Sequence, residues 1–230
     1  MKGKFSLFAI GLMLVLMMSV IQQAYATTYT YKRYPPYRTA KILRKETSGW
    51  LGLGRIYRAE INQAGFMYVH EKAQSVIWIR HSALVEFEMG DDLSKATWVP
   101  SKHDLTISIK LWYKGVQSSA GLWNTGYTNL RVSIEIYRWD PSGTTKVVDQ
   151  IVHEYIIRNG VIMAKNEADV YETTYYANFG AYYFATVKVL AECDSGYSGV
   201  ASIDYGDADK NNYLNLMWIQ YHCEPHSTPL

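Results

Sequence analysis

Oxygen-bearing side chains are concentrated in one short stretch near the end of this 230-residue chain: Asp204, Asp207, Asp209 and Asn211. The last three occupy alternate positions, as in the opening of a calcium loop, where hard oxygen ligands on a tight turn bind a hard cation. Asn212 stands where such loops prefer glycine, and Trp218 stands where an EF-hand has its closing glutamate. The stretch is therefore either a calcium site or an ordinary polar turn, and no motif in the chain requires any cofactor.

Aromatic residues are abundant, with 20 Tyr, 7 Trp and 6 Phe. Four of them have Gly, Ser, Thr or Asn as neighbours, which favours loops: Trp50, Trp98, Trp123 and Tyr127. An exposed ring in a loop can stack on a sugar ring, as in carbohydrate-binding modules, or it can close the end of a β-sandwich. Trp123 and Tyr127 lie in the longest irregular segment, 115–129, and are the expected ligand-binding residues.

Enzymatic motifs are not recognisable. The string from Gly196 to Val200 lacks the second glycine of a serine nucleophile elbow, and no Gly-rich phosphate loop occurs. Glu86 and Glu88 share one face of a predicted strand, a pattern more typical of a solvated strand face than of a glycosidase pair. No catalytic residue is assigned, and a non-enzymatic protein is favoured over a secreted hydrolase.

Two cysteines, Cys193 and Cys223, are the only ones in the chain. They do not form a C-x-x-C unit, which argues against a zinc or redox site. In an oxidising compartment such a pair is usually joined, so we expect a disulfide, with two buried thiols as the alternative. If the bond forms, the expected strands 183–193, 200–205 and 213–223 do not all lie side by side in one sheet.

The first 26 residues have the pattern of a secretory signal peptide. Lys2 and Lys4 precede an apolar run from Phe5 to Ile21, and Ala24 and Ala26 occupy the cleavage positions. Cleavage after Ala26 is expected, with a retained membrane anchor as the alternative. Later apolar runs are short and interrupted by charge, so no further membrane span is expected. Both alternatives predict a secreted or cell-surface protein.

Charge is divided unevenly along the remaining chain. Residues 27–58 carry eight basic side chains and one acidic one, whereas residues 59–230 carry 13 basic and 20 acidic ones. The near-zero total excludes a strongly basic nucleic-acid binder. We expect the basic segment Thr27 to Lys45 to form an extended arm before a domain of residues 46–230. The arm docks on its own domain, adds to a neighbouring subunit in self-association, or binds anionic lipid or envelope polysaccharide.

The elements that must position these residues are strands, because apolar residues recur with a period of two. Alternation is clearest over 105–111, 130–136, 183–193 and 213–223, and shorter candidates include 55–61, 66–70, 84–89 and 200–205. Turns are expected at Asp140 to Gly143 and, as a type I′ hairpin, at Asn159-Gly160. Residues 165–171 are expected to form one or two helical turns.

This pattern predicts a single antiparallel β-sandwich of immunoglobulin-like or jelly-roll type, with Greek-key connections. A fold of this kind carries no activity by itself. The leading hypothesis is an envelope protein with a structural or adhesive role. The alternative is an extracellular carbohydrate-binding module.

Overall fold

The computed structural model describes residues 28–48, 53–75, 79–121, 125–158, 160–207 and 211–227. The expected signal peptide, Trp50, Trp123 and Asp209 lie outside these residues. The described part contains thirteen strands and one short 3-10 helix, η1 (Leu93–Lys95). The strands are β1 (Tyr29–Arg33), β2 (Thr39–Ser48), β3 (Gly54–Ile61), β4 (Phe66–Gln74), β5 (Ser82–Gly90), β6 (Thr97–Val99), β7 (His103–Ala120), β8 (Tyr127–Asp140), β9 (Gly143–Arg158), β10 (Val161–Ala177), β11 (Ala181–Asp194), β12 (Val200–Tyr205) and β13 (Tyr213–Pro225).

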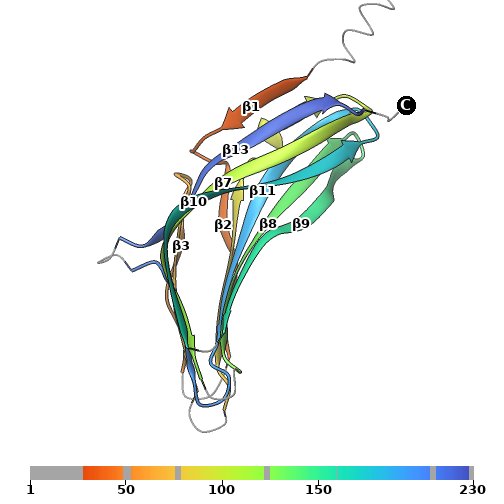
Figure 1. Cartoon of the computed structure of the whole chain (residues 1–230). Helices are drawn as coiled ribbons and strands as arrows, with labels where there is room; N and C mark the ends of the chain where they lie inside the picture. Colours follow the sequence, from red (N-terminus) through yellow and green to blue (C-terminus); the bar gives the residue numbers. More distant parts are fainter. Residues whose placement is uncertain are drawn as a thin grey trace, which may run out of the picture.

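The strands form two antiparallel sheets that face each other, which confirms the predicted sandwich. Sheet A has the order β1-β13-β4-β12-β7-β10, with β3 beside β4, and sheet B has the order β2-β5-β11-β8-β9, with β6 beside β11. The connections β7–β8, β9–β10, β10–β11 and β11–β12 each cross from one sheet to the other. Both sheets bend in the same direction, with sheet A on the outer side of the bend and sheet B on the inner side (Figure 1).

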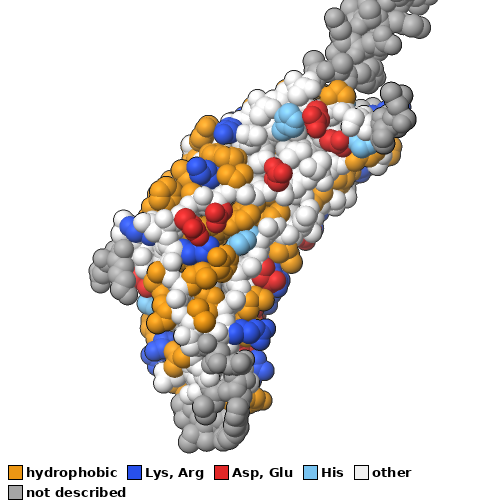
Figure 2. All heavy atoms as spheres, in the orientation of Figure 1, with side chains coloured by type: hydrophobic (Ala, Val, Ile, Leu, Met, Phe, Trp, Pro, Cys, Tyr) orange, Lys and Arg blue, Asp and Glu red, His pale blue; other side chains and the backbone are white. Residues whose placement is uncertain are grey.

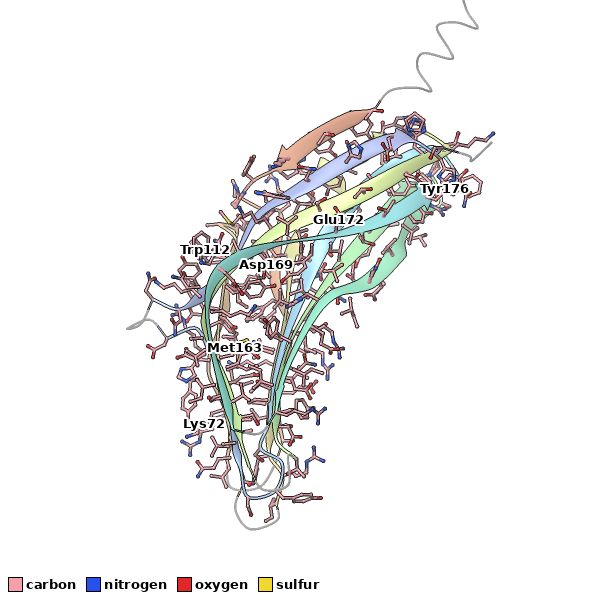
Figure 3. All side chains as sticks on the ribbon, viewed as in Figure 1. Lys72, Trp112, Met163, Asp169, Glu172 and Tyr176 are labelled. Carbon is pink, nitrogen blue, oxygen red and sulfur yellow. The ribbon has the colours of Figure 1, made fainter. Side chains whose placement is uncertain are left out.

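The core consists of the side chains that alternate toward the opposite sheet, and these side chains fill the space between the ribbons (Figure 3). On β11, every second residue from Tyr183 to Cys193 is fully buried. Leu105, Ile107, Ile109 and Leu111 of β7 in sheet A belong to the same core and are also fully buried. The period of two seen in the sequence is therefore the period of burial.

Strands β12 and β13 follow one another along the same neighbour, β7. Asp204 of β12 pairs with Val116, and Tyr213 of β13 pairs with Lys114, so the segment between them leaves the sheet opposite Gly115. A Cβ atom on Gly115 would lie 2.5 Å from the Tyr205 ring, so only glycine lets this ring cross β7. Asp204, the first of the candidate calcium residues, is thus the last residue of β12 that pairs with β7.

The basic segment Thr27 to Lys45 contributes one strand to each sheet. β1 pairs with β13 at the edge of sheet A, and β2 pairs with β5 at the edge of sheet B. Lys41 of β2 forms an ion pair with Glu88 of β5 at 3.0 Å. The segment is docked on its own chain, and self-association through it stays a prediction.

Two local expectations are wrong. Residues 165–171 belong to β10, which pairs with β7 along its whole length. The sequence hides this because Lys165 occupies an inward position, where its ammonium lies 3.7 Å from the Tyr155 ring and 2.6 Å from a Glu167 oxygen. At Gly160, the turn does not close a hairpin, since β9 pairs with β8 and β10 pairs with β7.

The expected disulfide between Cys193 and Cys223 is also wrong: both residues are free, buried thiols. Cys223 pairs with Leu105 near the start of β7, whereas Cys193 pairs with Thr128, whose hydroxyl donates to Gln117 near the end of β7. Twelve residues of strand span about 40 Å, far beyond the roughly 7 Å that a disulfide allows between Cα atoms. β11 does lie in a different sheet from β12 and β13, but the two cysteines lie far apart along the strands.

This placement predicts the thiol chemistry of the purified protein. Under native conditions neither thiol should react with Ellman's reagent, because both are buried, and in guanidinium both should react. A reductant should leave the melting temperature unchanged. Detection of an intramolecular disulfide by mass spectrometry of the non-reduced, denatured chain would contradict the arrangement.

A buried carboxylate, Glu71, lies among the inward residues of β4. Its side chain is fully buried, and no hydrogen-bond partner for either oxygen is found among the described residues. Burial, and then the negative charge of Glu192, raise the pKa of Glu71 well above its usual value. The folded state therefore holds a proton that the unfolded state releases at lower pH, and stability falls as pH rises above the ordinary glutamate pKa.

We expect Glu71→Leu to stabilise the protein by about 1–3 kcal/mol at pH 8, because it removes an unsatisfied buried polar group. The gain should shrink toward pH 5, because a larger fraction of the unfolded chains then also carries a proton on Glu71. Denaturant unfolding of the two proteins at both pH values measures this difference. The exposed Glu172 on β10 provides the control, since Glu172→Leu should show no such pH-dependent gain; the same gain in both variants would refute the assignment.

Candidate functional site

Three aromatic side chains form a row across sheet B on its outer face, at the end of the sandwich where Tyr176 is labelled in Figure 3. Tyr182 of β11 lies opposite Trp98 of β6 on one side and opposite Trp139 of β8 on the other. The ring centroids are 5.3 Å apart between Trp98 and Tyr182 and 5.8 Å apart between Tyr182 and Trp139. We call these three residues the aromatic row.

The row is open to solvent. It lies on the face of sheet B that points away from sheet A, which is the inner side of the bend (Figure 1). Trp98 is 51% exposed and Tyr182 is 41% exposed, while Trp139 is half-buried. The interplanar angles of 67° and 58° show that the rings do not stack on one another. Large exposed aromatic side chains that adjoin one another typically mark an interaction site.

Trp98 is held in place by its short strand. Asp92 caps η1 through a hydrogen bond from the Ser94 amide, and β6 follows with Val99 fully buried in the core. Alternation then directs Trp98 outward, and the Tyr29 hydroxyl of β1 donates to the Trp98 carbonyl at 2.7 Å. The indole lies against Gly180, where a Cβ atom would come within 2.8 Å of the ring. The backbone beneath the indole is therefore fixed from both sheets.

A stacked pair of rings continues this surface along the strands. Phe184 of β11 lies opposite Tyr137 of β8, with centroids 5.1 Å apart and planes 8° apart. Phe184 is nearly buried. The Tyr137 hydroxyl donates to Glu135, 2.6 Å away, so the apolar surface ends at a charged group.

Glu135 is the centre of a polar cluster next to the aromatic surface. Lys146 and Lys188 place their ammonium groups 2.7 and 2.9 Å from one carboxylate oxygen, and the other oxygen accepts from Tyr137. Burial opposes ionisation of Glu135, but the hydrogen bonds from Lys146, Tyr137 and Lys188 outweigh it and lower its pKa. The carboxylate is fully buried beneath its partners and fixes the positions of both lysines.

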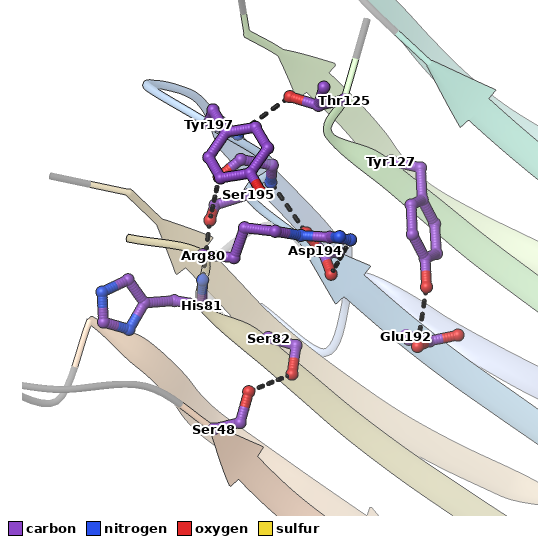
Figure 4. A network of polar contacts seen from close by, with 11 residues as sticks. Ser48, Arg80, His81, Ser82, Thr125, Tyr127, Glu192, Asp194, Ser195 and Tyr197 are labelled. Carbon is purple, nitrogen blue, oxygen red and sulfur yellow. Dashed lines mark hydrogen bonds and ion pairs between the residues drawn. The ribbon is translucent and has the colours of Figure 1, made fainter. Parts of the chain in front are cut away.

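The opposite end of the sandwich carries the expected ligand residue Tyr127. Its hydroxyl donates to Glu192 at 2.9 Å, and burial together with this acceptor raises its pKa to about 12 (Figure 4). Nearby, Arg80 contacts both oxygens of Asp194, and the Ser195 hydroxyl accepts from the His81 amide. The Tyr127 hydroxyl thus joins β8 to β11 beside these loop contacts, and Trp123 lies outside the described residues. Ligand binding by these two residues stays a prediction.

The candidate calcium residues are only partly described. The Asp204 carboxylate accepts from the Asp207 amide at 3.0 Å, as in a local Asx-type turn, and Asn211 has a left-handed φ of 53°. Asp209 lies outside the described residues, and no cluster of three possible metal ligands is found within them. Calcium binding here stays a prediction.

The exposed apolar side chains described on β10 do not form such a row. Ile162, Val170 and Tyr176 on edge strand β10 are exposed, but Asn166 and Glu172 share their side of the strand. Figure 2 shows this mixture of hydrophobic and charged side chains over the face that carries β10. The aromatic row differs because its members are direct cross-strand neighbours.

No protein-family model and no curated protein match this sequence. Among solved structures, the carbohydrate-binding module TmCBM61 in complex with β-1,4-galactotriose is 10% identical, covers 76% of this chain and 89% of its own, and has a TM-score of 0.24. A carbohydrate-binding module of Cellvibrio mixtus lichenase 5A in complex with cellotriose is 8% identical over 86% and 98% of the two chains, with a TM-score of 0.26.

A cleaved adhesin domain of Lys-gingipain from Porphyromonas gingivalis is 10% identical over 84% and 97% of the chains, with a TM-score of 0.24. TM-scores at this level carry no argument about function. Within the described residues, no helix has the length and apolarity needed to span a membrane.

The Glu135 cluster yields a prediction that is opposite in sign to that for Glu71. Because the pKa of Glu135 is lowered on folding, its contribution to stability is present above the ordinary glutamate pKa and is lost as pH falls through the folded value. Glu135→Gln should lower the free energy of unfolding by about 1–3 kcal/mol at pH 7, because two lysines lose a charged acceptor. Denaturant titration measures this loss, which should shrink at pH 3; an equal loss at both pH values would contradict the cluster.

Proposed function

We propose that this protein binds glycan chains non-covalently outside the cytoplasm, and that the aromatic row is its sugar-stacking platform. The observation that carries the proposal is the alignment of Trp98, Tyr182 and Trp139 on three adjacent strands. A pyranose ring has apolar C–H faces and a rim of hydroxyl groups. Aromatic rings bury the C–H faces, and a row of them suits an extended chain of sugars better than a single small molecule.

Polar groups adjoin the row, as hydroxyl recognition requires. Thr144 of β9 pairs with Trp139 directly, so its hydroxyl lies on the same face of sheet B as the row. Lys146 belongs to the Glu135 cluster one row further along. These groups supply both donors and acceptors at the edge of the rings, which favours a sugar over a purely apolar ligand.

The proposal gives the expected adhesive role a chemical basis. A non-catalytic surface that binds polysaccharide would hold the protein to an envelope or hold a cell to a glycan-coated surface. An apolar protein segment is the main alternative ligand for the row, and binding experiments distinguish it from a glycan.

We expect Trp98→Ala and Tyr182→Ala each to weaken glycan binding at least tenfold. Truncation of a central aromatic contact typically costs about 2 kcal/mol or more, and 1.4 kcal/mol corresponds to a factor of ten. A glycan array identifies a ligand for the wild-type protein, and isothermal titration with that oligosaccharide measures the dissociation constants.

The matched control is Tyr57→Ala. Tyr57 lies in β3 of sheet A and is 54% exposed, so its truncation removes a similar ring without changing the aromatic row. Equal dissociation constants for wild type, Trp98→Ala and Tyr182→Ala, with all three folded by circular dichroism, would refute the platform. Loss of binding in Tyr57→Ala alone would move the site to sheet A.

A further inference from the structure

A cavity of about 350 Å³ lies where the chain crosses from β1 to β2. The crossing segment, residues 34–38, joins the edges of the two sheets, and its path is fixed by hydrogen bonds from the Tyr37 amide to the Gln63 carbonyl and from the Arg38 amide to the Gly90 carbonyl. Asp91, after β5, and Lys95, in η1, complete the wall. The cavity is therefore built from segments that are held at both ends.

The lining of this cavity is strongly basic. Lys32, Arg33, Arg38 and Lys95 line it, against one carboxylate, Asp91. Asp91 already accepts a hydrogen bond from the Tyr221 hydroxyl at 2.8 Å and lies 3.9 Å from Arg33 Nε. No carboxylate partner of Arg38 or Lys95 is found among the residues that the structure describes. The cavity carries an excess of positive charge that its own acid does not neutralise.

Two buried donors at this cavity have no hydrogen-bond acceptor within the described chain. They are the hydroxyl of Tyr37, a residue that is only 1% exposed, and Nε of Arg33. Buried donors in native proteins almost always have a partner, and these two belong to residues that line the cavity. The uncompensated positive charge of the lining favours a ligand that presents anionic oxygen.

We propose that this cavity binds an acidic sugar, a pyranose that carries a carboxylate or phosphate group. The cations take the anionic group, and the exposed Gln63 amide is the partner for ring oxygens and hydroxyls. The volume exceeds what a bare oxyanion needs and falls at the lower end of small-ligand pockets. Tyr34 and Pro36 add apolar lining for the ring. This site uses none of the residues of the aromatic row and does not rest on the proposed function.

The test uses the full folded protein and four probes: glucuronate, glucose 6-phosphate, glucose and inorganic phosphate. Isothermal titration should detect binding of at least one acidic sugar, and that ligand should raise the melting temperature as its concentration exceeds the dissociation constant. Glucose should bind at least tenfold more weakly, because it lacks the charge. Inorganic phosphate should also bind at least tenfold more weakly than the acidic sugar, because it leaves the ring contacts unused.

Variants locate the binding. The double variant Arg38→Ala/Lys95→Ala should weaken it at least tenfold, whereas Lys45→Ala/Lys72→Ala removes the same charge outside the cavity lining and should leave it unchanged. Trp98→Ala should not affect it, which separates this site from the aromatic row.

Three results would overturn the inference. Equal binding of glucose and the acidic sugars would show that the cations are not used. Equal losses in the two double variants would show a diffuse effect of charge. Inorganic phosphate that binds as tightly as the acidic sugars would show a bare oxyanion site in place of a sugar site.

Discussion

The alternation of side chains along β11 is the constraint on which the structure depends. This strand lies in the middle of sheet B, and every second residue from Tyr183 to Cys193 is fully buried against sheet A. A shift of one residue would reverse both faces, so the register is fixed by the core. The residues between the buried ones are then forced onto the inner side of the bend. Tyr182 reaches the surface as the central ring of the aromatic row for this reason alone.

The side of the core between the two sheets must also be covered. The basic segment supplies β1 to one sheet and β2 to the other, and the short crossing between them covers the side of the core. Tyr37 fills the space beneath that crossing and is almost completely buried. The charge of this segment is therefore brought to a defined place at the edge, where it lines a cavity, and is not spread over a mobile tail.

Much of the fold could be predicted from the sequence, because strand alternation is a local signal. Sheet membership could not be predicted, since it depends on pairing between distant segments. Cys193 and Cys223 were expected to form a disulfide, yet Cys223 of β13 lies beside the start of β7 and Cys193 of β11 lies near its end. Lys165 hid its strand because a buried cation supported by Tyr155 breaks the apolar pattern.

The candidate site was only partly visible in the sequence for a similar reason. Small polar neighbours predicted a loop position for Trp98, either exposed or closing the end of the sandwich; the structure places it in strand β6 and at the surface. Tyr182 and Trp139 gave no signal, because residues within strands become a platform only through cross-strand register. Tyr127 had the right neighbours, but its hydroxyl is bonded to Glu192 at the other end of the sandwich.

The central claim, that the face of sheet B that points away from sheet A is the binding face, is tested most directly by fluorine NMR on protein labelled with 5-fluorotryptophan. Trp98 and Trp139 lie in the aromatic row, whereas Trp112 and Trp218 belong to strands of sheet A. On titration with a bound oligosaccharide, the resonances of the first pair should shift and those of the second pair should not. Shifts confined to Trp112 and Trp218 would contradict the account.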